Sequence, residues 1–410
     1  MPESASTDVD RFHDFRAKLG QEGMRPVVLD YLRWRRQSRA AQATGGPPPP
    51  MPEIGPLSIN LDLTTACNYA CDHCIDWEAL NSPVRHRDEE LRESLRRLAA
   101  RGLRSVILIG GGEPTLYPGF GEMVVFLKQL GLQVAVVSNG SRNEVIAEVA
   151  EHFTAGDWVR LSLDSGDDST FQAMHKPRRP IALAQILASA GALTQANPGL
   201  TLGFSFVITW RGARRDEVGL VENVGEMGRA ARLARDSGFD YISFKPYLNR
   251  AEDGAEVLEA EEALDERVAG AARIREGLQA AQAHARDGFR VIESTNLRVL
   301  LDGSWREYTR QPRECHMQLL RQVVSPLGVY NCPAHRGVQK ARIGGAAAWA
   351  DASAVGGTAR LLEGFDASVE CREVTCLYNP VNHFLEELVS GGADLEAAIE
   401  RLPDLGDTFL

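Results

Sequence analysis

Short apolar segments alternate with longer segments of helical spacing from residue 58 to about residue 250. The longer segments, such as 88–102 and 120–131, place apolar residues on one helical face. Strands that are apolar on both faces and alternate with helices are typical of a parallel α/β sheet, which right-handed crossovers curl into a barrel or open barrel. The apolar segments expected to form its six strands are 58–64, 105–110, 133–138, 158–164, 201–209 and 240–247.

Polar motifs follow the first four of these segments. Three cysteines come after the first, GGGEP (110–114) after the second and SNGS (138–141) after the third, and Asp164 closes the fourth. The carboxyl ends of parallel strands meet at one rim, which is where such sheets bind ligands. The sequence therefore predicts a site at that rim.

Changes in composition divide the chain into five regions. We expect residues 1–50 to form an N-terminal helical arm and a proline-rich linker, because GGPPPP (45–50) cannot continue a helix. We expect residues 51–250 to form the barrel. The acidic, alanine-rich residues 251–310 are expected to form a helical bridging region. Residues 311–385, with four cysteines and short strands around 322–332, form a smaller second domain, and residues 386–410 a C-terminal tail.

Charge and composition restrict the partners and the compartment. A formal net charge of −11 disfavours non-specific binding to nucleic acid or to an anionic membrane. We expect a cytoplasmic protein, because the sequence has neither a start typical of a signal peptide nor an apolar stretch of membrane-spanning length. In that reducing compartment the seven cysteines are better explained as metal ligands, redox groups or buried residues than as disulfides.

Three of the cysteines lie within eight positions, as Cys67-x3-Cys71-x2-Cys74. A redox dithiol would use only two of them, and haem attachment needs a histidine where Ile75 stands. A zinc site could add His73, although its place between two of the cysteines makes that geometry cramped. The remaining interpretation is an iron–sulfur cluster in which one iron lacks a protein ligand.

The loop CNYACDHC (67–74) resembles the cysteine loop of radical S-adenosylmethionine (radical SAM) enzymes, which follows the first strand of a partial (β/α)6 TIM-like barrel. In that family SAM chelates the open iron of a [4Fe–4S] cluster. One electron from the cluster cleaves SAM to methionine and a 5′-deoxyadenosyl radical, which abstracts hydrogen from the substrate. The resemblance implies this fold, SAM, a cluster held by Cys67, Cys71 and Cys74, and an electron donor of the flavodoxin or ferredoxin type.

The motif after the second strand matches a further element of the family. It resembles the family's GGEP element, which holds the amino group of SAM, and the matching residues are Gly111, Gly112, Glu113 and Pro114. A turn that opens a helix near Phe120 is the alternative. The motif is not a dinucleotide fingerprint, because the required third glycine is a threonine.

Polar residues at the next two strand ends are further candidates for SAM contacts. Ser162 and Asp164 resemble the family's ribose-contacting fourth strand, although they could instead cap the following helix. Ser138 and Asn139 are placed for a similar role, or are ordinary turn formers. His73 occupies the position where the family usually has an aromatic residue near the adenine.

The other four cysteines, Cys315, Cys332, Cys371 and Cys376, are separated by 16, 38 and 4 residues. Each could be a buried thiol, and together they could bind zinc. The arrangement resembles the auxiliary-cluster domains of radical SAM enzymes called SPASM and Twitch. Four cysteines fit the shorter Twitch form with one auxiliary [4Fe–4S] cluster, although its last two ligands are usually closer together.

Lys245 and Tyr247, near the end of the sixth strand, are the candidate catalytic residues. A lysine in the barrel mouth could accept a proton or orient an anionic group, but the sequence does not fix which face of the strand it occupies. Asp76 and Arg250 are further candidates without a motif.

The resemblance suggests a reaction. With all seven cysteines assigned to clusters, none is spare as the hydrogen donor that radical epimerases of the family use. The hypothesis is oxidation of a small sugar or aminocyclitol, as in natural product biosynthesis, with the auxiliary cluster as electron acceptor. Alternatives are cross-linking or oxidation of a ribosomal peptide, redox-neutral epimerisation or elimination, and a non-enzymatic electron carrier. The short N-terminal arm favours a small substrate over a peptide.

Overall fold

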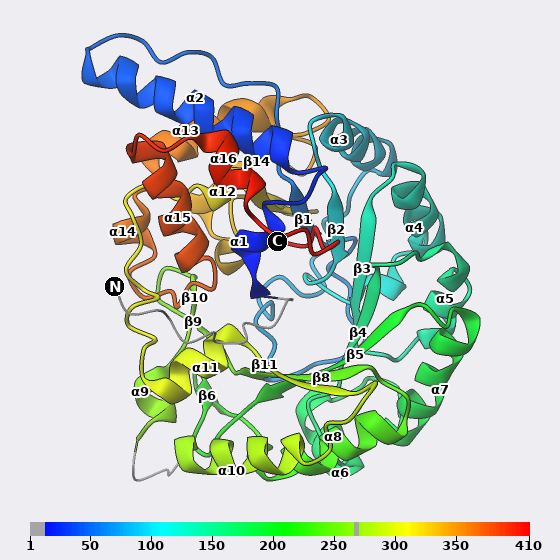
Figure 1. The fold of residues 1–410 in the computed structure, drawn as a ribbon. Helices are drawn as coiled ribbons and strands as arrows, with labels where there is room; N and C mark the ends of the chain where they lie inside the picture. The colour runs from blue at the N-terminus through cyan, green and yellow to red at the C-terminus, as the bar shows by residue number, and fades with distance from the viewer. Residues whose placement is uncertain (1–12, 266–269) are drawn as a thin grey trace.

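The computed structural model describes residues 13–265 and 270–410. Its centre is a ten-stranded sheet with the order β11-β8-β5-β4-β3-β2-β1-β12-β13-β14. The sheet curves around an interior, and helices cover its outer face (Figure 1). The strands of this sheet are β1 (Ser58–Leu61), β2 (Ser105–Leu108), β3 (Gln133–Ser138), β4 (Trp158–Ser162), β5 (Thr201–Ile208), β8 (Tyr241–Pro246), β11 (Arg290–Glu293), β12 (Arg321–Ser325), β13 (Gly328–Tyr330) and β14 (Arg342–Gly344).

Two short ribbons and the helices complete the fold. The ribbons pair β6 (Arg214–Arg215) with β7 (Val218–Gly219), and β9 (Asn249–Arg250) with β10 (Glu256–Val257). The helices are α1 (Phe15–Lys18), α2 (Arg25–Ala43), α3 (Asp88–Ala100), α4 (Phe120–Gln129), α5 (Asn143–Ala147), α6 (Asp168–His175), α7 (Leu183–Ala196), α8 (Met227–Asp236), α9 (Ala260–Ala263), α10 (Gly270–Gln282), α11 (Thr295–Asp302), α12 (Met317–Leu320), α13 (Ser353–Gly364), α14 (Ala367–Glu370), α15 (Asn379–Ser390) and α16 (Leu395–Glu400). No helix in the described ranges is long and apolar enough to cross a membrane.

The predicted partial barrel is confirmed. Each of the six expected apolar segments contains a strand, and β1, β2, β3, β4, β5 and β8 pair in parallel in that order. The connecting helices bury an apolar face against the sheet, as α3 does with Leu91, Leu95 and Leu98 at helical spacing. The carboxyl ends of these strands therefore form one rim, as expected.

The sheet continues beyond the six strands on both sides. The region 251–310, expected to be a helical bridge, also contributes β11, which pairs in parallel with β8. At the other edge, β12 pairs in parallel with β1 along its whole length, from Ser58 beside Arg321. The region 311–385 is therefore joined to the barrel by backbone hydrogen bonds, which also cover an edge of β1 that would otherwise be open.

Both ends of the chain pack against this body. Helix α2 of the N-terminal arm lies against α15 and α16. The expected C-terminal tail contains α16, and its last residues enter the inside of the barrel beside α1 (Figure 1). There Phe409 packs on Trp158 with 5.4 Å between ring centroids, and Lys18 pairs with Asp407 at 3.0 Å.

Candidate active site

A cavity of about 540 Å³ lies inside the curved sheet and reaches its carboxyl rim. Pro114 is the one predicted barrel-site residue that does not line it; this proline is buried at the start of a short helical turn. The cavity brings together the other candidates: Cys67, Cys71, His73, Cys74, Gly111, Gly112, Glu113, Ser138, Asn139, Ser162, Asp164, Lys245 and Tyr247.

The cysteine loop is fixed against the glycine motif by their backbones. The Glu113 N–H donates to the carbonyl of Ala66, next to the first cysteine, at 2.8 Å. A Cβ on Gly112 would lie 2.3 Å from that same carbonyl oxygen, so only glycine allows this approach. The glycine motif thus positions the loop that carries Cys67, Cys71 and Cys74.

Glu113 organises the rim through its buried carboxylate. It accepts hydrogen bonds from the Thr115 N–H and hydroxyl, from the Ser138 hydroxyl at 2.9 Å and from the Asn139 N–H at 2.7 Å. Burial raises the pKa of this carboxyl, and these donors oppose that rise. The Asn139 side chain donates in turn to Asn68 at 2.8 Å, within the cysteine loop. Glu113, Ser138 and Asn139 therefore join three strand ends to one another.

A carboxylate between two imidazoles lies beside the cysteines. Asp164 accepts from Val207 N–H at 2.6 Å and lies 3.1 Å from Nε2 of His73 and 3.5 Å from Nε2 of His175. Burial opposes ionisation of Asp164, but the hydrogen bond to His73 and the nearby imidazoles bring its pKa below the usual value. Nδ1 of His175 is 3.3 Å from Sγ of Cys71. Asp164 is thus held by the chain and does not cap α6, whose cap is the side chain of residue 167.

An arginine from the region 311–385 reaches this rim. Arg336 Nη1 donates to Asp76 Oδ2 at 2.7 Å, and its Nε lies 3.3 Å from Asp62 Oδ2. Gly110 leaves room for it, since a Cβ there would meet the guanidinium at 2.2 Å. Arg250 also approaches Asp76, at 3.6 Å, and donates to the backbone just before it. Asp76 and Arg250 are therefore brought together. With Arg336 they connect the cysteine loop to the region 311–385.

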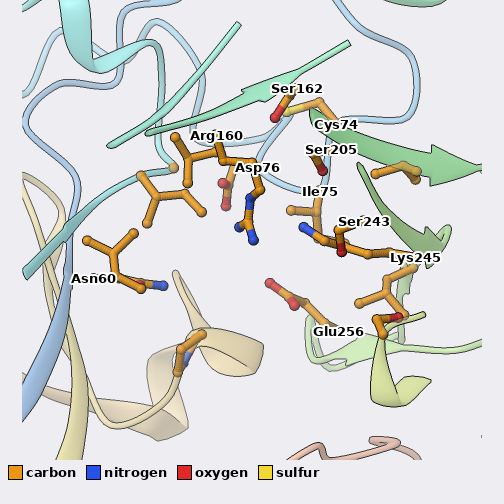
Figure 2. A pocket seen from close by; sticks show the side chains of 18 of the residues that line it. Asn60, Cys74, Ile75, Asp76, Arg160, Ser162, Ser205, Ser243, Lys245 and Glu256 are labelled. Carbon is orange, nitrogen blue, oxygen red and sulfur yellow. The ribbon is translucent and has the colours of Figure 1, made fainter. Parts of the chain in front are cut away.

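Both catalytic candidates lie at the cavity. Lys245 faces the interior together with Arg160 and Glu256 (Figure 2). Burial and the charge of Arg160 lower the pKa of Lys245 well below its usual value, and burial raises the pKa of Glu256 to about 7. The Tyr247 hydroxyl donates to Asn249 at 3.4 Å, and burial raises its pKa.

The four remaining cysteines converge on a second, smaller cavity. This cavity shares Pro333 and Tyr378 with the larger one, so these two residues form part of the wall between them. Burial raises the pKa of all four thiols, to about 11 for the first and about 12 for the last. The cysteines that line it are Cys315, Cys332, Cys371 and Cys376.

The donor sets fit the two expected clusters. All seven cysteines are free of disulfides and fall into one group of three and one group of four. Buried thiols that face one another become good ligands when a metal supplies positive charge. Three thiolates beside a larger cavity leave a coordination position open, whereas four around a small cavity close the site.

Sequence reasoning missed several residues of the rim and cavity, among them Arg160, His175, Glu256 and Arg336. Of these four, Arg160 carries a signal in the sequence, as a charged residue inside an apolar strand segment. The others reach the cavity from a helix end, a two-residue strand and a loop, where no periodic pattern marks them.

Comparisons with known proteins agree with this architecture. Residues 61–219 match the sequence model of the Radical SAM superfamily. An S-adenosylmethionine-dependent nucleotide dehydratase of Thermoplasmatales archaeon (strain ISO4-H5) is 36% identical over 114 residues, which are 27% of this chain and 39% of the relative. A Flammeovirga pacifica protein of the same name is 25% identical over 62% of this chain and 82% of its own length. The mycofactocin maturase MftC of Mycobacterium tuberculosis (strain CDC 1551 / Oshkosh) is 32% identical over 27% of this chain and 28% of its own.

Among solved structures, anSMEcpe with bound AdoMet and Cp18Cys peptide superposes with a TM-score of 0.54 over 85% of this chain and 100% of that one. At 15% identity this likeness concerns the fold. The family match covers the cysteine loop, the glycine motif and Asp164, all of which the structure places at one rim. The segment that builds this rim is therefore the part of the chain that is similar in sequence to the radical SAM superfamily.

Proposed function

We propose that this protein is a radical SAM enzyme that binds SAM beside Cys67, Cys71 and Cys74 and acts on a small substrate in the adjoining cavity. The observation that carries the proposal is that a single cavity collects these three cysteines and all but one of the predicted SAM contacts. With cluster and SAM bound, the site would supply a 5′-deoxyadenosyl radical that abstracts a hydrogen atom.

The chain's own residues position the cofactor in this proposal. The backbone of Gly111 and Gly112 offers a surface without side chains for the amino group of SAM. Asp164, held in place by Val207 and His73, offers a carboxylate to the ribose hydroxyls. Ser162 adds a hydroxyl at the end of β4. Tyr247 and Lys245 close the opposite side of the cavity, where the substrate would lie.

We further propose that the reaction is an oxidation of a sugar or aminocyclitol, with the four-cysteine site as electron acceptor. Two observations support this: the small cavity shares a wall with the large one, and all four of its cysteines face it. An external flavodoxin or ferredoxin would supply the electron for SAM cleavage. Both steps would take place in the cytoplasm.

A redox-neutral elimination is the second candidate, because the Thermoplasmatales and Flammeovirga relatives are named nucleotide dehydratases. The two reactions differ in electron balance. An oxidation leaves a product two electrons poorer than the substrate, whereas an elimination releases water without net oxidation. Mass spectrometry of the product after single turnover separates them, and solvent deuterium at an inverted carbon would indicate epimerisation instead. A peptide substrate would be indicated by turnover of a peptide encoded beside the gene.

Anaerobic reconstitution tests whether the protein holds two clusters and cleaves SAM. We expect about eight irons per chain, falling to about four in a Cys67/Cys71/Cys74 triple alanine variant. The parent protein should convert SAM to 5′-deoxyadenosine when reduced with dithionite, and the variant should not. Unchanged iron in the variant, or no SAM cleavage by the loaded parent, would contradict the proposal.

A further inference from the structure

Three strands place polar residues in register on the inner face of the barrel. Ser205 of β5 lies beside Ser162 of β4 on one side and beside Ser243 of β8 on the other. Arg160 lies two residues before Ser162 on β4, and Lys245 lies two residues after Ser243 on β8. Both therefore share the inward face of their strands and line the cavity. Figure 2 shows the Arg160 and Lys245 side chains directed at the same space, with the hydroxyls of Ser205 and Ser243 beside it.

Within residues 13–265 and 270–410, neither cation has an acidic partner. In the described part of the structure no carboxylate oxygen lies within 4.0 Å of the Lys245 ammonium or the Arg160 guanidinium. Nε of Arg160 is buried without a hydrogen-bond partner, and its guanidinium lies 5.1 Å from the ring centre of Trp158. Two neighbouring cations without an anion are unfavourable in a cavity of low polarity. Their arrangement favours a bound anion.

Most carboxylates that line the cavity have partners other than Arg160 and Lys245. Asp76 is paired with Arg336, Asp164 contacts His73, and Asp407 is paired with Lys18. Glu113 is satisfied by backbone and hydroxyl donors. Among the described lining residues, Glu256 has the side-chain carboxylate without such a partner. It faces the same space, and its raised pKa of about 7 leaves it partly neutral.

The geometry points to an anion site in which Arg160, Lys245, Ser205 and Ser243 bind a phosphate group of the substrate. The inference rests on the proposed function and narrows its substrate class to phosphorylated small molecules. A phosphate monoester carries a charge near −2 at neutral pH, which balances two cations, whereas a carboxylate balances one. Its three oxygens accept from the guanidinium, the ammonium and the two hydroxyls. Glu256, across the space, would face a hydroxyl or amino group of the same molecule.

Titration calorimetry with inorganic phosphate on the reconstituted protein tests the site. At constant ionic strength we expect phosphate binding that weakens about tenfold or more in Arg160→Met and in Lys245→Met, since each removes charge-assisted hydrogen bonds. Lys245→Arg, which keeps the charge, should retain binding. The control variant Arg87→Met removes an exposed cation just before the start of α3, and it should bind phosphate as the parent does. Acetate should bind at least about tenfold more weakly than phosphate.

The inference is overturned if the parent does not bind phosphate, if both methionine variants bind it within twofold of the parent, or if acetate binds equally well. A methionine variant that fails to hold iron is replaced by the Ser205→Ala/Ser243→Ala double variant, for which weaker phosphate binding is again expected and unchanged binding refutes the site. SAM cleavage without substrate is measured in the same preparations. SAM cleavage without phosphate binding refutes the anion site alone, whereas phosphate binding without SAM cleavage refutes the proposed function.

Discussion

Replacing Arg336 with methionine removes the cation shared by two buried carboxylates. Arg336 is 7% exposed, and Asp62 is fully buried. Removing one member of a buried ion pair costs about 3–5 kcal/mol, because the remaining charge stays desolvated. Asp76 keeps Arg250 at 3.6 Å, so Asp62 bears most of the loss. We expect Arg336→Met to destabilise the protein by that amount near neutral pH.

The size of the effect in a melting experiment can be worked out from the chain length. For 410 residues the entropy of unfolding is on the order of 0.9 kcal/mol per degree, so the loss corresponds to about 3–6 °C in Tm. It should also depend on pH. Burial raises the pKa of Asp62, and Arg336 opposes that rise. Without Arg336 the folded protein holds a proton that the unfolded chain releases, so stability decreases as pH increases.

The assay is thermal unfolding of the reconstituted protein, followed anaerobically by circular dichroism at one fixed scan rate. The decrease in Tm should be larger at about pH 8 than at about pH 5.5. An Arg336→Met/Asp62→Asn double variant, which removes the stranded charge, should recover part of the loss. An equal decrease at both pH values, with no recovery in the double variant, would show that Arg336 acts through packing rather than charge.

Three further predictions concern the cysteine sites and the cavity. Cys332→Ala should lower iron by about four per chain while SAM cleavage persists, and unchanged iron would exclude it as a ligand. Gly112→Ala should lower both iron content and Tm, because its Cβ would lie 2.3 Å from the Ala66 carbonyl oxygen. The matched control is Gly191→Ala on α7, where a Cβ meets open space, and this variant should stabilise the protein by up to about 1 kcal/mol. Burial raises the pKa of Glu256 from 4.5 to about 7, so the native state loses stability as pH rises through this range. Glu256→Gln should therefore stabilise the protein by up to about 3 kcal/mol at pH 8 and by progressively less towards pH 5. A gain in stability that does not depend on pH would contradict this.

The sequence predicts the barrel because its strands carry a local signal. Segments such as 133–138 and 201–209 are apolar on both faces, and the motifs after them fall at one rim by topology. Polar residues inside these segments carry a second signal, since Ser205 and Lys245 interrupt apolar runs at positions that face the interior. The sequence alone does not fix which face of its strand Lys245 occupies, and the structure supplies that information.

The contacts between distant segments could not be predicted in this way. Arg336 and Asp76 are 260 positions apart, and neither lies in a periodic element. Strand β11 is four residues long with charged residues at both ends, so it has no apolar run. Glu256 enters the cavity from a two-residue strand. These features depend on how the whole chain folds, and a pattern within one segment does not contain that information.

The pairing of β12 with β1 makes the barrel inseparable from the region 311–385. A protein ending near residue 310 would keep every barrel strand, yet the whole backbone edge of β1, from Ser58 to Leu61, would lose its hydrogen-bonding partner. An unpaired edge of buried, apolar character is a template for joining a second molecule. Such a truncated protein would self-associate through the strand that leads into its cysteine loop, so the folding of one cysteine site depends on the segment that carries the other.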